Sequence, residues 1–300
     1  MPASLCLLFA TFLWGSSFVA LKYAISSYDP AFVIFLRMLI ALLVSLCLWR
    51  WVKRFQYKSG DWKYLLTMSL AEPCLCFLFE GYAMQYTSAS QAGVLVSCLP
   101  IIVAFLAYYM LKERLSKAII CGFSLCIGGS LLLTIISPSS ADAADPVLGN
   151  FLEFLAMICA AYYSVTLKQL ATRYSPLSLI ALQGISGTLF FAPFLFFIEL
   201  PEVHNSNALW SILYLGTFVT LGGYGFYNYA LSKVSVLTAA AYSNLIPIFS
   251  LLLSAIILGE LLNFEQWLSI LVVFSGVVVS QQHKTEQIVV PREDAEVGSV

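Results

Sequence analysis

Long apolar blocks alternate with short polar connections along the whole chain, and no amphipathic period runs through the blocks. A helix needs about 20 apolar residues to cross a hydrocarbon core about 30 Å thick. Barrel strands need short alternating segments instead, so these continuous blocks exclude a β-barrel. The pattern therefore predicts an all-α polytopic membrane protein. We expect ten transmembrane helices, at 4–25, 30–51, 62–84, 89–111, 117–136, 148–168, 176–198, 209–231, 236–258 and 264–281.

Composition and charge agree with this fold class. The 300 residues are 60% hydrophobic and 10% charged, whereas a soluble domain carries about 25% charged residues. A net charge of -1 gives no basic surface, so we expect no nucleic-acid partner. Residues 282–300 are polar and acidic, and we expect a disordered tail there.

The distribution of basic residues predicts the orientation. If the N-terminus is cytoplasmic, all but two of the 15 Lys and Arg residues fall in cytoplasmic loops or the tail. The two exceptions are Lys22, in an outer loop, and Arg37, within a predicted span. The positive-inside rule then places both termini in the cytoplasm of a cell (inner or plasma) membrane.

The two halves of the chain resemble each other at an offset of about 147 residues. Pro100 and Glu113 are thirteen residues apart, as are Pro247 and Glu260. Earlier in each half, Lys22 with Pro30 matches Lys168 with Pro176. Five spans per half is an odd number, so we expect residues 4–136 and 148–281 to form two inverted five-helix repeats. Inverted repeats are typical of secondary transporters that work by alternating access; a passive channel or a lipid scramblase is the alternative.

Several motifs carry a family resemblance over residues 4–281. They are WGSSF at 14–18, YTSASQAG at 86–93, Pro100 followed by KER at 112–114, and Pro247 followed by GE at 259–260. With the five-plus-five pattern, the chain resembles the EamA-domain transporters of the drug/metabolite transporter superfamily. The resemblance implies a monomeric or homodimeric ten-helix carrier with a central cavity between the repeats. It implies transport of small metabolites such as amino acids, or of organic cations, and we expect an exporter that a proton gradient can drive.

Four acidic or basic residues lie within the predicted spans and away from the span ends, where charge is costly and usually faces a cavity or a partner. Counting 1.5 Å per residue puts Glu72 near the midplane and Arg37, Glu80 and Glu153 together nearer the outer face. An Arg37–Glu80 or Arg37–Glu153 ion pair is one interpretation; substrate binding or gating is the other. Glu72, with no basic residue at its depth, either faces the cavity or is protonated and bonded to a neighbouring helix.

Other polar, aromatic and proline residues also fall at mid-span. Pro73, Pro100 and Pro247 are candidate hinges or simple kinks, because proline removes a helical hydrogen bond. The remaining candidates for the wall of a substrate cavity are Trp14, Gln91, Tyr227, Asn228 and Asn244.

The sequence lacks the residue combinations that intramembrane enzymes use for catalysis or metal binding. The only histidines are His204, in an outer loop, and His283, in the tail, and none of the eight cysteines forms a CxxC pair. We therefore expect no catalytic residue, no metal site and no cofactor. No P-loop is present to bind ATP.

Overall fold

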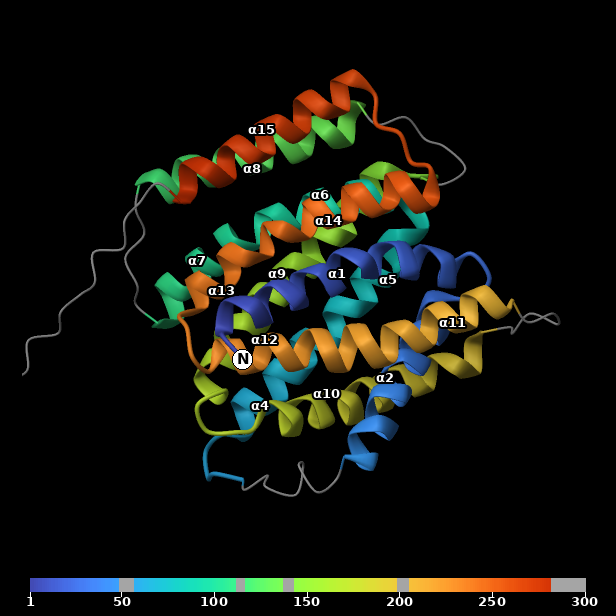
Figure 1. Ribbon diagram of the computed structural model, residues 1–300, viewed down its shortest axis with the longest axis vertical. Helices are drawn as coiled ribbons and strands as arrows, with labels where there is room; N and C mark the ends of the chain where they lie inside the picture. The colour runs from blue at the N-terminus through green and yellow to red at the C-terminus, as the bar shows by residue number, and fades with distance from the viewer. Residues whose placement is uncertain (49–56, 112–116, 137–142, 199–204, 282–300) are drawn as a thin grey trace, which may run out of the picture.

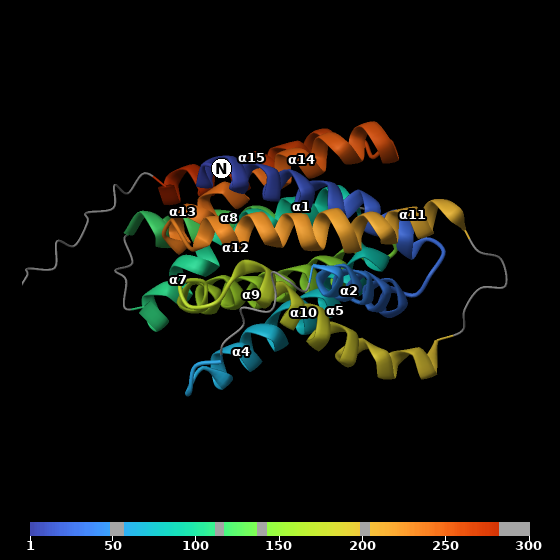
Figure 2. The same ribbon diagram turned by 60° about the horizontal axis from the view of Figure 1, so that its bottom comes forward.

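A computed structural model describes residues 1–48, 57–111, 117–136, 143–198 and 205–281 of the chain. Across these residues the chain forms helices and turns and no β-strand. Figure 1 shows rod-like helices lying roughly side by side, and the turned view of Figure 2 shows them stacked in more than one layer. The predicted tail and Glu113 lie outside the described residues.

The first half of the chain contains α1 (Ala3–Ile25), α2 (Pro30–Cys47) and α8 (Lys117–Ile136) as uninterrupted helices. Between them lie two interrupted stretches. In one, α4 (Trp62–Ser69) passes through a π-helical segment, Leu70–Leu75, into α5 (Cys76–Tyr86). In the other, α6 (Ala89–Leu95) passes through a 3₁₀ turn, Val96–Cys98, into α7 (Leu99–Leu111).

The second half follows the same order. It begins with α9 (Pro146–Leu170) and α10 (Pro176–Phe191), which runs on into a 3₁₀ turn, Ala192–Phe197. A π-helical segment, Leu215–Gly223, joins α11 (Ser206–Tyr214) to α12 (Tyr224–Leu231). After α13 (Val236–Ser243) come α14 (Leu245–Leu253), a π-helical turn at Ser254–Leu258, and α15 (Phe264–Gln281).

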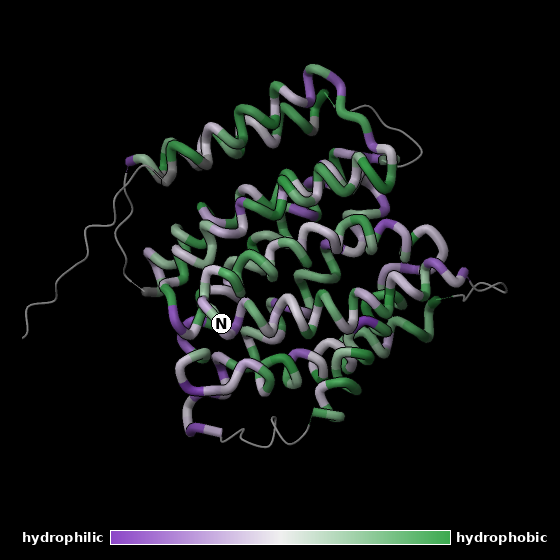
Figure 3. Tube along the Cα trace, in the orientation of Figure 1, coloured by the Kyte–Doolittle hydropathy of each residue, from purple (hydrophilic) through white to green (hydrophobic). Residues whose placement is uncertain are grey.

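These helices follow the predicted apolar blocks to within a few residues. The helix α2 ends at Cys47, short of residue 51, and α9 extends beyond 148–168 at both ends. Seven helical stretches are long and apolar enough to cross a membrane. The stretches at 62–86, 117–136 and 264–281 are not among those seven, so the count of ten spans stays a prediction. Figure 3 shows hydrophobic residues along the helices and polar residues gathered near their ends.

Local sequence explains why several helices begin where they do. The Asp29 side chain accepts a hydrogen bond from the backbone of Ala31 at 2.8 Å, with Pro30 as the first helical residue. Ser175 caps α10 in the same way, ahead of Pro176. A capping side chain satisfies a free backbone N–H, and proline fits the first helical position because its missing N–H is not needed. The matched caps lie 146 residues apart.

Helix pairs repeat between the two halves. In the outermost pair, α8 packs along α15 (Figure 1), and α2 packs along α10. In the interior, α1 contacts α12 and α14, and α9 contacts the corresponding α5 and α7. Close approach of α8 and α15 depends on glycine: a Cβ on Gly129 would lie 2.8 Å from the backbone nitrogen of Val273.

Two lysines at equivalent positions make equivalent contacts. The Lys22 ammonium donates to the backbone carbonyls of Met84 and Thr87, both at 2.8 Å. The Lys168 ammonium donates to the carbonyls of Leu231 at 2.9 Å and Val234 at 2.6 Å. Each cation thus satisfies free carbonyls at the C-terminal end of a helix, α5 or α12, where the helix dipole favours positive charge.

Candidate functional site

The backbone breaks at Glu72, in the π-helical segment that joins α4 to α5. Glu72 has φ -145° and ψ 119°, far from helical values, and Pro73 follows it. The amide of Gln183, on α10, donates to the Glu72 carbonyl at 3.2 Å. The break thus turns a backbone carbonyl toward a neighbouring helix, as proline in a membrane helix allows.

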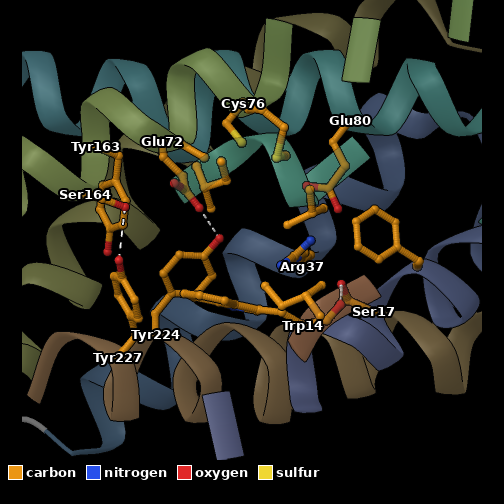
Figure 4. A pocket seen from close by; sticks show the side chains of 16 residues that line it. Trp14, Ser17, Arg37, Glu72, Cys76, Glu80, Tyr163, Ser164, Tyr224 and Tyr227 are labelled. Carbon is orange, nitrogen blue, oxygen red and sulfur yellow. Dashed lines mark hydrogen bonds between the residues drawn. The ribbon is translucent and has the colours of Figure 1, made fainter. Parts of the chain in front are cut away.

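A cavity of about 60 Å³ lies beside this break, in the middle of the helix bundle. A cavity needs roughly 10–15 Å³ on this measure to hold one water molecule, so about four fit. The lining comes from both halves of the chain: Trp14, Ser17, Phe18, Arg37, Glu72, Cys76, Glu80, Val96, Leu99, Met157, Ala160, Tyr163, Ser164, Tyr224, Tyr227 and Ile246. Figure 4 shows many of these side chains converging from different helices.

Glu72 points into the cavity toward α12. The Tyr224 hydroxyl donates a hydrogen bond to its carboxylate, and the two side chains face each other in Figure 4. The Trp14 ring packs against Tyr224 and Tyr227, with centroids 5.1 and 4.9 Å apart. Glu72 therefore faces the cavity and is also bonded to a neighbouring helix, and its protonation stays a prediction.

Arg37 lines the same cavity. It is only 2% exposed; its Nε donates to the Thr220 hydroxyl at 2.9 Å, and its guanidinium lies 4.0 Å from the centre of the Phe77 ring. The expected ion pair with Glu80 or Glu153 is not formed: among the described residues, the only direct ion pair joins Arg173 and Asp61. The guanidinium instead contacts the Thr220 hydroxyl and the Phe77 ring. Nothing in the sequence marks these two residues as its partners.

Glu72 shares its cavity with a basic residue, although the count of residues along the helices put none at its depth. Arg37 acts on it electrostatically, as does Glu80, and all three line one cavity. Counting residues along a helix gave different depths, but that count assumes straight helices, and the chain is broken at Glu72. Glu153 lies outside the lining, fully buried on α9.

Of the predicted polar wall, Trp14 and Tyr227 line the cavity, whereas the amides Gln91, Asn228 and Asn244 do not. Gln91 accepts a hydrogen bond from the Asn150 amide at 3.1 Å, at the junction of α6 and α9. Asn228 accepts a hydrogen bond at 2.8 Å from the hydroxyl of Tyr163, which does line the cavity. The Asn244 amide donates to the carbonyl of Ala241 at 3.1 Å. A buried amide has donors and acceptors that need partners, yet the side-chain nitrogen of Asn228 and the side-chain oxygen of Asn244 have none among the described residues.

The lining residues that sequence reasoning missed include two buried tyrosines, Tyr163 and Tyr224. Tyr224 stands three residues before Tyr227, so both lie on one face of α12. That spacing was the available signal. Tyr163 follows Tyr162 in α9, and nothing in the sequence indicates which of the two faces the cavity.

The candidate hinge prolines all lie at helix interruptions. Pro100 follows the 3₁₀ turn at Val96–Cys98, and Pro247 follows the boundary between α13 and α14 at Asn244. Pro73 follows the break at Glu72. The positions fit kinks, and hinge motion stays a prediction.

The described residues contain no group of three or more His, Cys, Asp or Glu side chains able to hold a metal ion. What the cavity does contain is one guanidinium and two carboxyl groups between aromatic and hydroxyl-bearing walls. Such a set can bind a small molecule that carries both charges.

Comparison with known proteins gives consistent matches over most of the chain. The profile of the EamA-like transporter family matches twice, at residues 1–135 and 147–281. A Bacillus subtilis protein named uncharacterized transporter YetK is 27% identical over 93% of this chain and 87% of its own length. An uncharacterized transporter from Archaeoglobus fulgidus is 24% identical, over 91% of this chain and 95% of its own. A crystal structure with 17% sequence identity has the same fold at a TM-score of 0.67, covering 93% of this chain and 96% of the other.

Proposed function

Because this chain belongs to the EamA-like transporter family, we propose that it carries a small zwitterionic metabolite, such as an amino acid, across the cell membrane. Transport runs through the cavity between Arg37 and Glu72 by alternating access, in the direction of export. The chain is a multi-pass membrane protein whose homologues are named transporters. Such proteins are generally not enzymes.

The observation that carries the proposal is that one small cavity is lined by a guanidinium and by two carboxyl groups. A guanidinium such as that of Arg37 binds a carboxylate through two parallel hydrogen bonds. The carboxyl groups of Glu72 and Glu80 can accept an ammonium group. The rings of Trp14 and Tyr227 add aromatic faces that favour cations and apolar side chains. An organic cation with no carboxylate would leave the Arg37 guanidinium without an anionic partner, and the two positive charges would repel each other. A zwitterion therefore fits the cavity better.

Alternating access rests on two inverted repeats, and three observations support that arrangement. The family profile matches once in each half. Lys22 and Lys168 make equivalent hydrogen bonds to equivalent carbonyls. Leu99 and Ile246, which occupy matching positions of the two halves, both line the cavity. Two similar halves of opposite orientation provide two conformations of comparable energy.

Ten spans with both termini in the cytoplasm complete the proposal. In Figure 1 the start of α1 and the red end of α15 lie at the same end of the bundle, which fits an even number of crossings. Labelling of single cysteines in a cysteine-free background tests the orientation. Asn205→Cys, between α10 and α11, should react with an impermeant reagent from outside the cell, and Lys233→Cys only from inside. The reverse pattern would refute the orientation.

The test of function is counterflow in proteoliposomes loaded with amino acids, nucleobases or cationic drugs. We expect saturable exchange of amino acids that Arg37→Gln abolishes, while Glu265→Gln, at an exposed carboxylate on α15, leaves it unchanged. Outward transport in cells then establishes the direction. Flux without saturation or competition would identify a passive channel, and movement of labelled lipid alone would identify a scramblase.

A further inference from the structure

A carboxyl group that the transport cavity does not use is buried next to it. Glu153, on α9, is 0% exposed, and neither of its carboxylate oxygens has a hydrogen-bond partner. An ionised carboxylate in this position would lose its hydration without gaining a hydrogen bond to compensate. Even a single charge in the middle of a membrane helix costs about 2.5–3.5 kcal/mol on insertion scales. Glu153 is therefore most stable when it holds a proton.

Glu80 lines the cavity, whereas Glu153 does not. Glu80 is on α5, which packs along α9, and it is 9% exposed. Glu80 is close enough to interact electrostatically with Glu153, and Arg37 is close enough to interact with Glu80. Other titratable groups contributed by neighbouring elements are Cys76 of α5, Glu72 at the break, Tyr224 of α12, and Cys159 of α9 itself.

The charges around the cavity do not balance if every group is ionised. Arg37 supplies one positive charge against the three carboxylates of Glu72, Glu80 and Glu153. Two neighbouring carboxylates in a site of low dielectric do not both ionise, because their repulsion keeps a proton on the pair. A metal ion would require more ligands than two carboxyl groups, and the described residues hold no such cluster.

We propose that Glu80 and Glu153 form a proton-binding pair that couples transport to the proton gradient. This inference rests on the proposed function, and it places the coupling site at the interface of α5 and α9. The proton is bound to a carboxyl oxygen of Glu153 and passes to the carboxylate of Glu80, then to water in the cavity. Each transfer breaks one O–H bond and forms another, and no redox partner is involved.

Substrate and proton compete at this pair. An ammonium group bound beside Glu80 favours the ionised form of that carboxylate, so it drives the proton out of the pair. A proton returning from the other side of the membrane weakens the ammonium site and releases the substrate. The expected stoichiometry is the exchange of one proton for one zwitterion.

The first experiment reads the proton directly and needs no substrate. Infrared spectra of the protein in nanodiscs are recorded across a pH titration, for the wild type, Glu153→Gln, Glu80→Gln and Glu265→Gln. We expect the wild type and Glu265→Gln to show a carbonyl stretch of protonated carboxylic acid that Glu153→Gln lacks and Glu80→Gln shifts. An undiminished band in Glu153→Gln would overturn the proposal. If that variant does not fold, an unshifted band in Glu80→Gln overturns it equally.

The second experiment measures coupling in proteoliposomes with radiolabelled amino acids. For each variant we compare uptake driven by an imposed pH gradient with counterflow at equal pH. We expect the ratio of the two to fall at least tenfold in Glu153→Gln and to stay at the wild-type value in Glu265→Gln. An unchanged ratio in Glu153→Gln overturns the proton pair but leaves the carrier standing. Absence of counterflow in the wild type refutes the carrier, and the infrared titration then decides the pair alone.

Discussion

Removal of the Glu260 side chain should loosen the start of α6, which belongs to the other half of the chain. Gly259 ends the preceding helical turn at φ 69°, a left-handed conformation that glycine adopts freely, and Glu260 follows it. The Glu260 carboxylate accepts hydrogen bonds from the backbone nitrogens of Ala89 at 3.1 Å and Ser90 at 2.9 Å. It also accepts the Ser90 hydroxyl at 2.5 Å. Together with Ser88, which caps Gln91, it satisfies the first three free N–H groups of α6.

The expected loss follows from those bonds. In Glu260→Ala the N–H groups of Ala89 and Ser90 lose their acceptor, and both residues are buried. Each unsatisfied buried donor costs about 1–3 kcal/mol, but water can reach a helix end, and measured losses of a helix cap are about 0.5–2 kcal/mol. We therefore expect local opening to become easier by about 2 kcal/mol, which corresponds to about 30-fold at a tenfold change per 1.4 kcal/mol.

Hydrogen–deuterium exchange of the protein in nanodiscs measures this opening directly. Peptides covering residues 88–95 should exchange about 30-fold faster in Glu260→Ala and less than that in Glu260→Gln, which keeps one acceptor oxygen. The matched control is Glu265→Ala, which removes an exposed carboxylate five residues away. Exchange in Glu260→Ala at the rate of this control would refute the assignment of Glu260 as the cap of α6.

Three further changes have defined outcomes. Lys22→Met should speed exchange at the end of α5, and Lys168→Met at the end of α12; an effect in one half alone would contradict their equivalence. Arg37→Lys keeps the charge but loses the planar fork, so half-saturation in counterflow should rise about tenfold; unchanged half-saturation would argue against carboxylate binding there. Gly129→Leu should lower the thermal unfolding midpoint by forcing α8 from α15, whereas Gly128→Leu, with nothing within 4 Å of its Cβ, should not; equal midpoints would contradict the close packing.

The sequence predicts the helices well because their signals are local. Apolar length, the Asp29–Pro30 and Ser175–Pro176 starts, and the breaks at proline each depend on a few neighbouring residues. The family resemblance, too, came from contiguous motifs, and the family match confirms it.

The walls of the cavity were harder to predict, because membrane helices are apolar on every side. The pattern of a helix such as α9 does not indicate which face meets its neighbours, so Tyr163 could not be chosen over other residues. Polarity alone suggested Gln91, yet it is hydrogen-bonded to Thr87 and Asn150, and none of the three lines the cavity. Arg37 was identified as a charge within a span. Its partner Thr220 is 183 positions away in the sequence, and their contact depends on how α2 packs.

The two halves of the chain supply equivalent helices to the cavity but different side chains. At the repeat offset of 146 or 147 residues, Arg37 corresponds to Gln183, Glu72 to Val219 and Glu80 to Tyr227, so the first half supplies every ionisable acid or base of the lining other than tyrosine. If the two halves rock against each other, the formal charges of the cavity lining move with the first half alone through the electric field of the membrane. A full charge moved across 100 mV changes a free energy by about 2.3 kcal/mol. Membrane voltage would then favour one orientation of the empty carrier, and loading the cavity with a proton or a zwitterion would change how strongly it does so.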